Sequence, residues 1–581
     1  MERTIENGVL RLSNVNQEVT LVGWVAKKRN FGSLVFIDLR DRTGICQIVC
    51  KEEFAEITSK IRNEYVIKVK GIVVEREQKN KNLPTGDVEV IANEITIINV
   101  ADTTPLIIAD QTDALEDTRL KYRYLDLRRP CMQQKIIERH KITRAMRNFL
   151  DEQGFIEIET PLLGKTTPEG ARDYLVPSRM NPGKFYALPQ SPQLYKQLLM
   201  ISGFEKYYQV ARCFRDEDLR SDRQPDFTQV DIEMSFMSEK EIMDLMERLF
   251  ERMFKEVKGY ELKLPIRRVG YKEALSTYGS DKPDTRFGYE LCDVTSAFEN
   301  TEFVVAKSVL AENGTIRGLR AYDLANKLSR KDIDAYTELA KKYHAKGLMW
   351  CRYVNDAFEG PLSKQLSAEE LAKIKEIAGL ENNDLFFAVA DRSYENACNA
   401  LGAIRSSLGK RFAADKLVGF DLLWVTDFPM FEWDYDEEAY APSHHPFTRP
   451  YDEDLQYLDS DPGRVRSHHY DLVLNGYELG SGSLRIYNEE LQKKIFEICG
   501  LSDEEIKNKF GFFIDAFHYG TPPHGGVAFG LDRIAMILTG SDSIRDVIAF
   551  PKNASGVCPM SEAPTPAGER QLRDLHLKVE E

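Results

Sequence analysis

The sequence predicts a multidomain α+β protein, and three observations lead to this fold class. The N-terminal part contains short strand-like runs without a long helix, whereas the rest of the chain mixes helical and strand patterns. The chain has 581 residues, enough for about two to four domains. Hydrophobic residues make up 42% and charged residues 29%, which is typical of a soluble globular protein with a sizeable core.

The composition also limits where such a protein works. The N-terminus, Met1–Asn7, lacks the apolar segment of a secretory signal, and no apolar run is long enough to span a bilayer. The nine cysteines are scattered and never spaced as Cys-x-x-Cys, which favours free thiols in a reducing cytoplasm. The net charge of −15 argues against non-specific DNA coating but permits a local RNA-binding surface. We therefore expect a cytoplasmic protein with no membrane partner.

Five runs rich in Val, Ile and Leu predict a small β-barrel at the N-terminus. They are separated by turn residues, for example Gly32-Ser33 and Thr43-Gly44, and by one short helical segment near 52–62. The expected strands are 18–25, 34–40, 45–50, 66–75 and 88–97. Five strands in this arrangement are typical of an OB-fold, which we assign to residues 1–103.

The rest of the chain predicts a catalytic domain that is split by an insertion. A connector (104–130) leads to a helix at about 131–153, which opens the first part of the domain, residues 131–285. Residues 286–410 differ in texture: they combine an expected strand at Glu302–Ala306 with helices at Ser367–Ala378 and Tyr394–Leu408. They carry no chemical motif, so we interpret them as an inserted α+β domain. The second part, 411–581, includes a C-terminal extension.

Residues 214–236 are the most informative stretch of the chain. Its second half alternates strictly, with Val230, Ile232, Met234 and Phe236 on one face of a strand. The opposite face carries only hydrogen-bonding side chains: Gln229, Asp231, Glu233 and Ser235. A half-buried strand with solvent behind it would look similar, but four such side chains without a lysine favour a polar cavity floor.

An arginine precedes this strand. Arg215 ends the preceding strand-like run, where its guanidinium suits bidentate contact with phosphate or carboxylate. The alternative is a surface salt bridge within Arg215–Asp218. Phe227, between this arginine and the polar face, is either a core residue or a stacking platform.

A second arginine begins a helix far downstream. A short apolar run ends at Gly530, and Arg533 follows in the first helical turn. A cation there opposes the helix dipole, whereas a bound anion would relieve the conflict. Taken together, the two arginine motifs resemble motifs 2 and 3 of class II aminoacyl-tRNA synthetases, whose two arginines grip ATP.

Two acidic residues between these motifs suit a magnesium ion. Asp471 and Glu478 offer hard oxygen ligands for Mg²⁺ carried on ATP phosphates. Strict strand alternation places them on opposite faces, and a bulge at Gly476 would bring them together. The sequence therefore supports Glu478 as a metal ligand better than it supports Asp471. His444 and His445 point opposite ways on a strand and lack further ligand spacing, which disfavours zinc.

Two cations beside the polar floor predict the choice of substrate. If Lys196 and Arg485 face one small pocket, they should select a second carboxylate on the substrate, because a neutral amide cannot compensate two buried positive charges. Glu169 and Asp231 would accept hydrogen bonds from a substrate ammonium. The alternative is that Lys196 is simply solvated.

The resemblance extends over nearly the whole chain and is specific. Six segments are similar to the bacterial-type aspartyl-tRNA synthetases. This family has an N-terminal OB domain, a class II catalytic domain built on an antiparallel sheet, and an insertion between motifs 2 and 3. The matching segments are 167–179, 190–196, 214–236, 444–448, 475–485 and 525–533. The resemblance implies a cytoplasmic homodimer that uses ATP, Mg²⁺, L-aspartate and tRNA(Asp). It implies two steps: aspartyl-adenylate formation with release of pyrophosphate, then transfer to the terminal adenosine of tRNA with release of AMP.

The resemblance also implies residue roles. The catalytic residues would be Arg215, Glu478 and Arg533, with Glu478 and Asp471 as metal ligands. ATP would be bound by Arg215, Asp216, Glu217, Gln224, Phe227, Glu478, Gly530, Leu531, Asp532 and Arg533. Aspartate would be bound by Glu169, Gln193, Lys196, Arg215, Asp231, His444 and Arg485.

The barrel would read the anticodon. Phe36 shares a strand face with Asp38 and Arg40, opposite apolar neighbours, which predicts an exposed stacking platform. The family's reading positions fall on Arg29, Phe36, Gln47, Arg76, Asn80, Asn82 and Glu89. Lys27 and Lys28 lie there too, with a solvated loop as the alternative. The segment Lys27–Phe31 departs from the family's usual arginine run, which leaves charging of tRNA(Asn) open.

Two other functions remain as alternatives. A binding-only relative should have lost an ATP arginine or the acidic ligand, yet Arg215, Glu478 and Arg533 are all present. A relative specific for asparagine or lysine would have the same architecture. Lys196 together with Arg485 argues against both, since lysine would be repelled and asparagine would leave charge unpaired.

Overall fold

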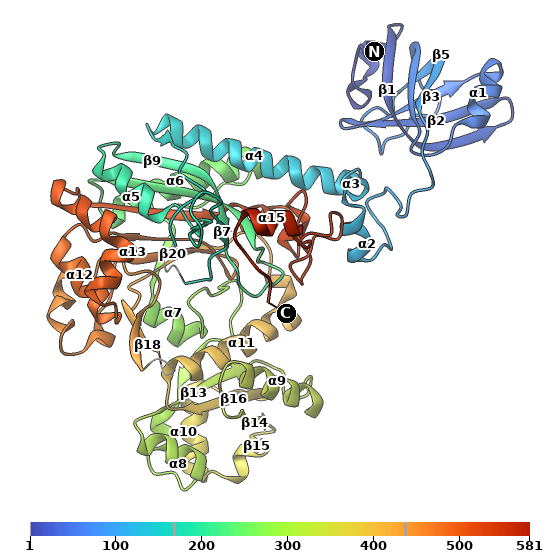
Figure 1. Cartoon of the computed structure of the whole chain (residues 1–581). Helices are drawn as coiled ribbons and strands as arrows, with labels where there is room; N and C mark the ends of the chain where they lie inside the picture. The colour runs from blue at the N-terminus through green and yellow to red at the C-terminus, as the bar shows by residue number, and fades with distance from the viewer. Residues whose placement is uncertain (1, 167–169, 435–437, 581) are drawn as a thin grey trace. The chain divides into compact units, whose positions relative to one another are not determined.

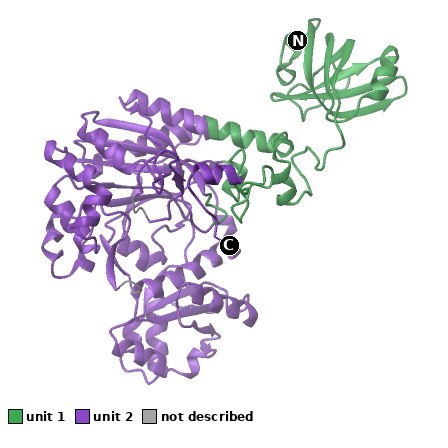
Figure 2. Ribbon diagram, viewed as in Figure 1, with its two compact units in different colours: residues 1–140, 219–224, 539–567 green, residues 141–218, 225–538, 568–581 purple. Residues whose placement is uncertain are grey.

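The computed structural model describes residues 2–166, 170–434 and 438–580 (Figure 1). The chain divides into two compact units (Figure 2). One unit comprises residues 1–140, 219–224 and 539–567, and the other comprises residues 141–218, 225–538 and 568–581. Within the described residues, no helix combines the length and the apolar character needed to cross a membrane.

The first unit begins with a closed five-stranded barrel in the order β1-β2-β3-β5-β4, which confirms the predicted OB-fold. The barrel closes where β3 pairs with β5 in parallel, while the other neighbouring strands are antiparallel. Alternate residues point inward, so Val, Ile and Leu fill the interior, each burial contributing about 1.5–3 kcal/mol. The strands are β1 (Glu18–Phe31), β2 (Leu34–Asp41), β3 (Gly44–Cys50), β4 (Val66–Glu75) and β5 (Val88–Asn99), with α1 at Ala55–Lys60.

A buried carboxylate organises the remainder of the first unit, which contains α2 (Glu116–Lys121), α3 (Arg123–Asp126) and the start of α4 (Pro130–Glu152). Asp126 is fully buried and accepts hydrogen bonds from Arg119, Arg123 and Arg129. Arg123 also donates to the backbone carbonyls of Arg545, Ile548 and Ala549. These bonds hold the connector against the 539–567 segment.

The second unit is built on an eight-stranded sheet in the order β11-β17-β20-β21-β22-β10-β9-β6. The two edge pairs, β6 with β9 and β11 with β17, are parallel, and the strands between them are antiparallel, as predicted. The strands are β6 (Ile156–Glu157), β9 (Lys206–Phe214), β10 (Asp226–Ser235), β11 (Arg267–Gly270), β17 (Leu422–Thr426), β20 (His469–Leu474), β21 (Tyr477–Leu484) and β22 (His524–Gly530). Because β10 pairs with β22, the two arginine motifs become neighbours.

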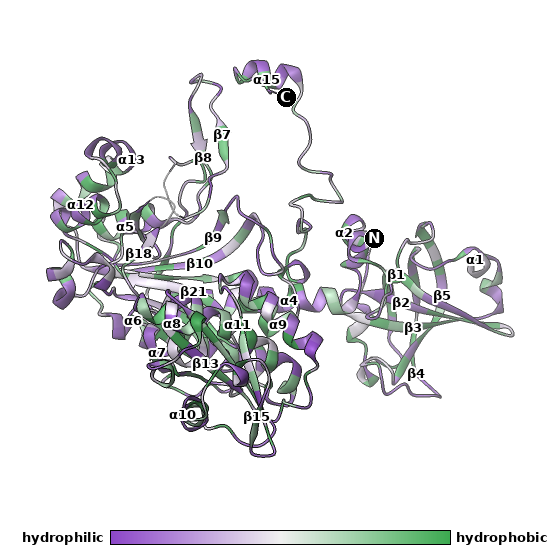
Figure 3. Ribbon diagram, turned by 90° about the horizontal axis from the view of Figure 1, so that it is seen from below, coloured by the Kyte–Doolittle hydropathy of each residue, from purple (hydrophilic) through white to green (hydrophobic). Residues whose placement is uncertain are grey.

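Helices and small hairpins surround this sheet. In Figure 3, β9 and β10 carry both hydrophilic and hydrophobic residues along their length. Because successive residues of a strand point to opposite faces, this mixture gives β10 a polar face and an apolar face. The helices are α5 (Gln193–Ile201), α6 (Glu239–Lys258), α7 (Tyr271–Tyr278), α12 (Glu489–Ile498), α13 (Asp503–Ala516), α14 (Leu531–Leu538) and α15 (Glu569–Asp574). The hairpins pair β7 (Leu175–Pro177) with β8 (Phe185–Ala187) and β18 (Phe431–Asp434) with β19 (Ala439–Pro442).

A second, five-stranded sheet lies between the two halves of the catalytic sheet in sequence, in the order β12-β13-β16-β14-β15. Its strands are β12 (Leu291–Asp293), β13 (Thr315–Ala321), β14 (Met349–Val354), β15 (Ala357–Glu359) and β16 (Asp384–Asp391). Its helices are α8 (Val304–Ala311), α9 (Arg330–Lys342), α10 (Ala368–Ala378) and α11 (Tyr394–Phe412). The exact domain boundaries remain our proposal.

The strand expected at Glu302–Ala306 is wrong, because α8 begins at Val304. Val304 and Val305 are exposed, whereas Ala306 and Val309 are buried, which is the spacing of a helix rather than a strand. A short apolar run does not distinguish a strand from a buried helix by its periodicity.

Candidate active site

The polar face predicted on β10 is buried. Asp231 and Glu233, on a strand between β9 and β22, have no exposed surface. A Cβ at Gly526 on β22 would lie 2.1 Å from Glu233 Oε2, so only glycine leaves room for this carboxylate. The prediction for Phe236 was wrong: β10 ends at Ser235, and Phe236 has a φ of 62° and is 65% exposed.

Four charged side chains meet on this floor, and we call them the charged quartet: Lys196, Asp231, Glu233 and Arg485. Lys196 Nζ, from α5, lies 2.9 Å from Asp231 Oδ1 and 3.5 Å from Glu233 Oε2. Arg485 holds the other side of Glu233 with Nε to Oε1 at 2.9 Å and Nη2 to Oε2 at 3.1 Å. Lys196 is 1% exposed, so the solvated alternative for it is wrong.

Glu233 stays ionised in spite of its burial. Burial alone disfavours the charged form, but the neighbouring charges of Arg485 and Lys196 outweigh it and hold the pKa of Glu233 below its ordinary value. Glu233 thus bridges both cations. Sequence alternation placed Glu233 on the polar face but did not reveal this role.

The quartet retains hydrogen-bonding capacity for a ligand. Of the five N–H groups of Arg485, two bind Glu233 and two bind Ser483 Oγ and His445 Nε2, which leaves one. Lys196 donates one hydrogen bond, to Asp231, and forms an ion pair with Glu233, which leaves at least one of its three donors. Among the described residues, the buried atoms Asp231 Oδ2 and Gln193 Nε2 have no hydrogen-bond partner. A buried polar atom without a partner is costly, so these groups fit a polar ligand. Glu169, predicted beside them, lies outside the described residues.

His445, rather than His444, contacts the quartet. Arg485 Nη1 donates to His445 Nε2 at 2.8 Å, and Nδ1 lies 3.3 Å from Thr448 Oγ1. Because a guanidinium only donates, Nε2 must accept and the ring is neutral. Nδ1 also lies 3.3 Å from the backbone nitrogen of Phe447. Burial, together with the Arg485 charge, holds the pKa of His445 well below its ordinary value. Strand parity alone did not decide between the adjacent histidines.

His444 faces the acidic residues instead. Its ring stacks on His469, with centroids 3.4 Å apart and planes 13° apart. His469 Nε2 lies 2.9 Å from Asp471 Oδ1 and 3.0 Å from Ser481 Oγ. Burial lowers the pKa of His444 to about 4. Its predicted contact with aspartate remains a proposal.

A bulge brings Asp471 and Glu478 to the same side of the β20–β21 hairpin. Leu472 pairs with Gly480 while Val473 pairs with Glu478, so Leu479 is the extra residue. Gly476, where we expected the bulge, forms the turn instead, with a φ of 83°. A bulge therefore does reconcile the two carboxylates, three residues further along the chain than predicted.

These two carboxylates suit a divalent cation. Burial raises the pKa of both groups, and the Asp471 charge raises that of Glu478 further. A bound cation would relieve both effects. No cluster of three or more potential metal ligands occurs within the described part of the chain. A pair fits Mg²⁺, which commonly takes one or two carboxylates and completes its shell with phosphate oxygens and water.

The two predicted ATP arginines differ in what they contact. The Arg215 guanidinium lies 5.1 Å from the Phe227 ring centroid, and its Nε has no partner among the described residues. Arg533, in the first turn of α14, donates from Nη1 to the backbone carbonyl of Glu478 at 2.5 Å. The motif 3 arginine thus contacts the strand that carries the predicted metal ligand.

The other predicted ATP residues make contacts within the protein. Asp532 accepts a hydrogen bond from the Thr228 N–H at 2.8 Å, which joins α14 to β10. Asp216 forms a bridge with Arg172. Gln224 belongs to the first unit, where it exchanges hydrogen bonds with the backbone of Lys552. Gly530 pairs with Gln229, Leu531 is buried, and Glu217 follows β9. Direct contact of these residues with ATP remains a proposal.

The barrel brings most of the predicted anticodon residues together. Gln47 accepts hydrogen bonds from Arg29 and Arg76 and donates to Glu89, while Arg29 also binds Asp38. Phe36 is half-buried and packs edge-on against the exposed Phe31, with ring centroids 5.8 Å apart.

Neighbouring residues of the barrel have different roles. Asn80 and Asn82 lie in the β4–β5 loop, where Asn80 Oδ1 accepts the Asn82 N–H. Lys28 instead donates to the carbonyls of Thr58 and Ile61, a structural role rather than a solvated one.

Comparison with known proteins defines the class. Residues 115–554 match the family of class II tRNA synthetases (D, K and N), and residues 19–98 match the OB-fold nucleic acid binding domain. The chain therefore belongs to the class II tRNA synthetases of the D, K and N group.

Two relatives are similar to this chain over nearly its whole length. The chain is 52% identical over 583 residues to the aspartate–tRNA(Asp/Asn) ligase of Geobacillus sp. (strain WCH70), covering 99% of this chain and 98% of the relative. It is also 52% identical over 585 residues to the aspartate–tRNA ligase of Geobacillus kaustophilus (strain HTA426), covering 100% and 99%.

Two solved structures share the fold. Asparaginyl-tRNA synthetase from Pyrococcus horikoshii, complexed with asparaginyl-adenylate, has a TM-score of 0.60 at 20% identity, covering 95% of this chain and 98% of that one. Aspartyl-tRNA synthetase from Entamoeba histolytica has a TM-score of 0.57 at 21% identity, covering 93% and 90%.

Proposed function

We propose that this chain is an ATP-dependent, AMP-forming aspartate–tRNA ligase that charges tRNA(Asp). The observation that carries the proposal is the charged quartet with its remaining donors. One N–H of Arg485 and one of Lys196 suit the side-chain carboxylate of L-aspartate, and Asp231 Oδ2 suits its ammonium. Family membership and the names of the full-length relatives support the same reaction.

The first step activates aspartate. The side-chain carboxylate is held by Arg485 and Lys196, which leaves the α-carboxylate toward Arg215. An α-carboxylate oxygen bonds to the α-phosphorus of ATP, the bond from that phosphorus to the bridging oxygen breaks, and pyrophosphate leaves. Arg215 neutralises the α-phosphate and Arg533 the γ-phosphate, so positioning and charge do most of the work. Mg²⁺ held by Glu478 and Asp471 would supply further charge neutralisation at the phosphates.

The second step transfers the aspartyl group. A ribose hydroxyl oxygen of the terminal adenosine bonds to the aspartyl carbonyl carbon, the bond from that carbon to the phosphate oxygen breaks, and AMP leaves. The hydroxyl proton is released. The protein holds the aspartyl side chain through the quartet in both steps, so the specificity of the first step is kept in the second.

The barrel would supply the tRNA contact. Phe36 offers a ring for stacking, and Arg29 is its partner across β1 and β2. Gln47 joins Arg29 to Arg76 and Glu89 by hydrogen bonds. The names of the two Geobacillus relatives differ in whether they include tRNA(Asn), and Lys27–Phe31 departs from the usual family pattern. Charging of separate tRNA(Asp) and tRNA(Asn) transcripts distinguishes the two substrates.

Assembly and location are part of the proposal. We propose a homodimer, as the resemblance to class II synthetases implies, and a cytoplasmic location. All nine cysteines are free thiols, which suits a reducing compartment. Light scattering on the purified protein measures the oligomeric state, and a monomer would contradict the proposed assembly.

The decisive experiment is ATP–pyrophosphate exchange with aspartate, asparagine and lysine offered separately. We expect exchange with aspartate alone. Exchange with asparagine or lysine in place of aspartate would show that the quartet selects another side chain. A folded protein that supports no exchange with any of the three would be the binding-only relative.

A further inference from the structure

One loop of the catalytic domain links the inserted domain to the acidic pair, Asp471 and Glu478. It follows α7 and begins at the cap residue Gly279, which has a φ of 67°. Ser280, Asp281 and Lys282 come next. We call residues 279–287 the α7 loop.

The α7 loop packs against the hairpin that carries the acidic pair. A Cβ at Gly476, in the hairpin turn, would lie 3.1 Å from the Asp284 Cβ. Thr285 bonds the Asp421 carboxylate, and Asp421 exchanges backbone and side-chain hydrogen bonds with Asn475, the other turn residue. The loop is therefore fixed relative to Asp471 and Glu478.

Lys282 brings a positive charge to this place. It forms an ion pair with Asp281 at 3.4 Å, which occupies one of its three donors, and 47% of its side chain is exposed. Partial desolvation lowers the pKa of Lys282, but the charges of Asp281, Glu478 and Asp471 raise it by more, so its pKa lies above the ordinary value. The geometry agrees, because Asp284 of the same loop packs against the hairpin turn at Gly476. A lysine on a loop is ordinarily solvated, but here it lies within electrostatic range of two buried carboxylates.

Helix α11 of the inserted domain holds the α7 loop at both ends. A Cβ at Gly402 would lie 1.8 Å from the Gly279 carbonyl oxygen, so helix and loop are in direct backbone contact. Further along, the buried Arg405 donates to the carbonyls of Asp284 at 3.0 Å and Phe287 at 2.9 Å. The insertion thus fixes the loop on either side of Lys282.

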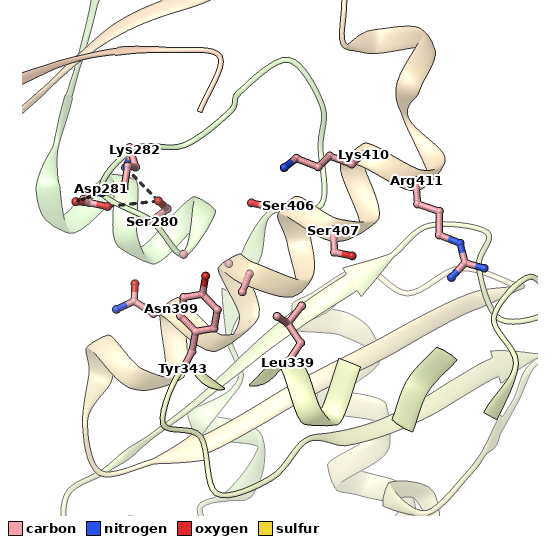
Figure 4. A pocket seen from close by; sticks show the side chains of 13 residues that line it. Ser280, Asp281, Lys282, Leu339, Tyr343, Asn399, Ser406, Ser407, Lys410 and Arg411 are labelled. Carbon is pink, nitrogen blue, oxygen red and sulfur yellow. Dashed lines mark hydrogen bonds and ion pairs between the residues drawn. The ribbon is translucent and has the colours of Figure 1, made fainter. Parts of the chain in front are cut away.

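A polar cavity of about 840 Å³ opens between the same elements (Figure 4). Lys282 lines it from the α7 loop, and Lys410 lines it from α11, together with the hydroxyls of Ser280, Ser406 and Ser407. Neither Asp471 nor Glu478 is among the described residues that line it. The cavity therefore shows only that the Lys282 side chain is open to solvent rather than packed into the protein.

We propose that Lys282 is an additional nucleotide-binding residue, which contacts the β- and γ-phosphates at the acidic pair, and that α11 of the inserted domain positions it. This inference rests on the proposed function. The ligand is a magnesium-bound polyphosphate, either ATP or the pyrophosphate leaving group. Two cations, Arg533 and Lys282, then flank the phosphates whose metal the acidic pair would hold. The inserted domain thereby acquires a role in the first step of the reaction.

The test compares Lys282→Ala with Lys410→Ala, a matched removal of a lysine from the same cavity. For Lys282→Ala we expect KM for ATP and for pyrophosphate to rise about tenfold or more, with KM for aspartate unchanged. Calorimetric binding of magnesium pyrophosphate should weaken by a similar factor, and Lys282→Arg should recover part of the loss. Lys410→Ala should match the wild type. Equal effects of the two alanine variants, or wild-type pyrophosphate binding by Lys282→Ala, would overturn the proposal.

The role of α11 needs its own variant. Arg405→Lys keeps the charge but cannot bond both carbonyls, so it should raise KM for ATP without changing KM for aspartate. Combined with Lys282→Ala, Arg405→Lys should raise KM for ATP no further, because the lysine that Arg405 helps to position is already absent. Additive effects would overturn the positioning role, and the melting temperature excludes unfolding. Failure of the proposed function is distinguishable: the wild type would then show no aspartate-dependent exchange at all.

Discussion

The charged quartet and the acidic pair lie on the same sheet, yet they balance their buried charges differently. In the quartet, two cations and two carboxylates cancel, and Glu233 bridges Lys196 and Arg485. In the acidic pair, Asp471 and Glu478 have the same sign, and burial raises the pKa of both. The charges of the first site balance within the protein, whereas those of the second need a cation from outside.

This contrast predicts opposite effects of the same chemical change. Glu233→Gln leaves Lys196 and Arg485 without their common carboxylate, and breaking a buried ion pair typically costs about 3–5 kcal/mol. We expect a large fall in the melting temperature measured by calorimetry. Glu478→Gln is the matched control: it removes a like charge, so the free protein should melt at the same temperature or higher while exchange is lost. A stabilised Glu233→Gln protein would contradict the difference between the two sites.

The next largest effect concerns catalysis alone. Arg533→Ala removes a guanidinium that donates to the Glu478 carbonyl. A cation in the first turn of a helix opposes the helix dipole, so its removal should change folding little. Loss of a charge-assisted phosphate contact should cost about 2–4 kcal/mol of transition-state stabilisation. Exchange kinetics, compared with the melting temperature, measure the two effects separately. Near wild-type exchange by a folded variant would remove Arg533 from the nucleotide site.

Phe36 on the barrel is less buried than the charged quartet and the acidic pair, and it provides a third comparison. Phe36 is half-buried and contacts Phe31 rather than the barrel core. Phe36→Ala should therefore raise KM for tRNA, since truncating a stacking aromatic costs about 1–3 kcal/mol per base. It should leave tRNA-independent exchange unchanged, which provides the internal control. A lower melting temperature together with lost exchange would instead identify Phe36 as a core residue.

Local sequence patterns predicted much of the fold, because strand alternation and turn residues act over short distances. The barrel strands, the polar face of β10 and the helix start at Arg533 all follow from such patterns. Contacts between residues that are distant in sequence did not follow from such patterns. Glu233 and Arg485 are 252 positions apart, and only the folded sheet pairs them.

Irregular backbone also escaped prediction. The bulged residue Leu479 is not distinctive in the sequence, and Gly476, three residues earlier, forms the turn instead. His445 and His444 are neighbours with identical side chains, so their different partners depend on the tertiary structure. The role that we propose for Lys282 was not predicted either. Lys282 lies on a loop that is held by α11, a helix of the inserted domain.

The smallest expected effect concerns His445, which contacts Arg485 of the quartet, and the pH dependence of the protein's stability. His445 remains neutral in the folded protein because its pKa is held well below the ordinary value of 6.5. In the unfolded chain the same ring takes up a proton as the pH falls below about 6.5. The unfolded state then binds more protons than the folded state, so stability is lost as the pH falls, by up to about 1.4 kcal/mol per pH unit for one group. At higher pH this contribution is constant.

His445→Gln removes the titrating ring while its amide oxygen can still accept from Arg485. We therefore expect the variant to melt below the wild type at pH 7.5, since a fitted hydrogen bond is altered, and the difference to narrow between pH 6.5 and pH 5. Melting temperatures of the two proteins across this range measure it. Because the other buried histidines are present in both proteins, the difference between them isolates His445. A gap that stays constant or widens as the pH falls would mean that His445 titrates normally in the folded protein, and that Arg485 does not depend on its neutral form.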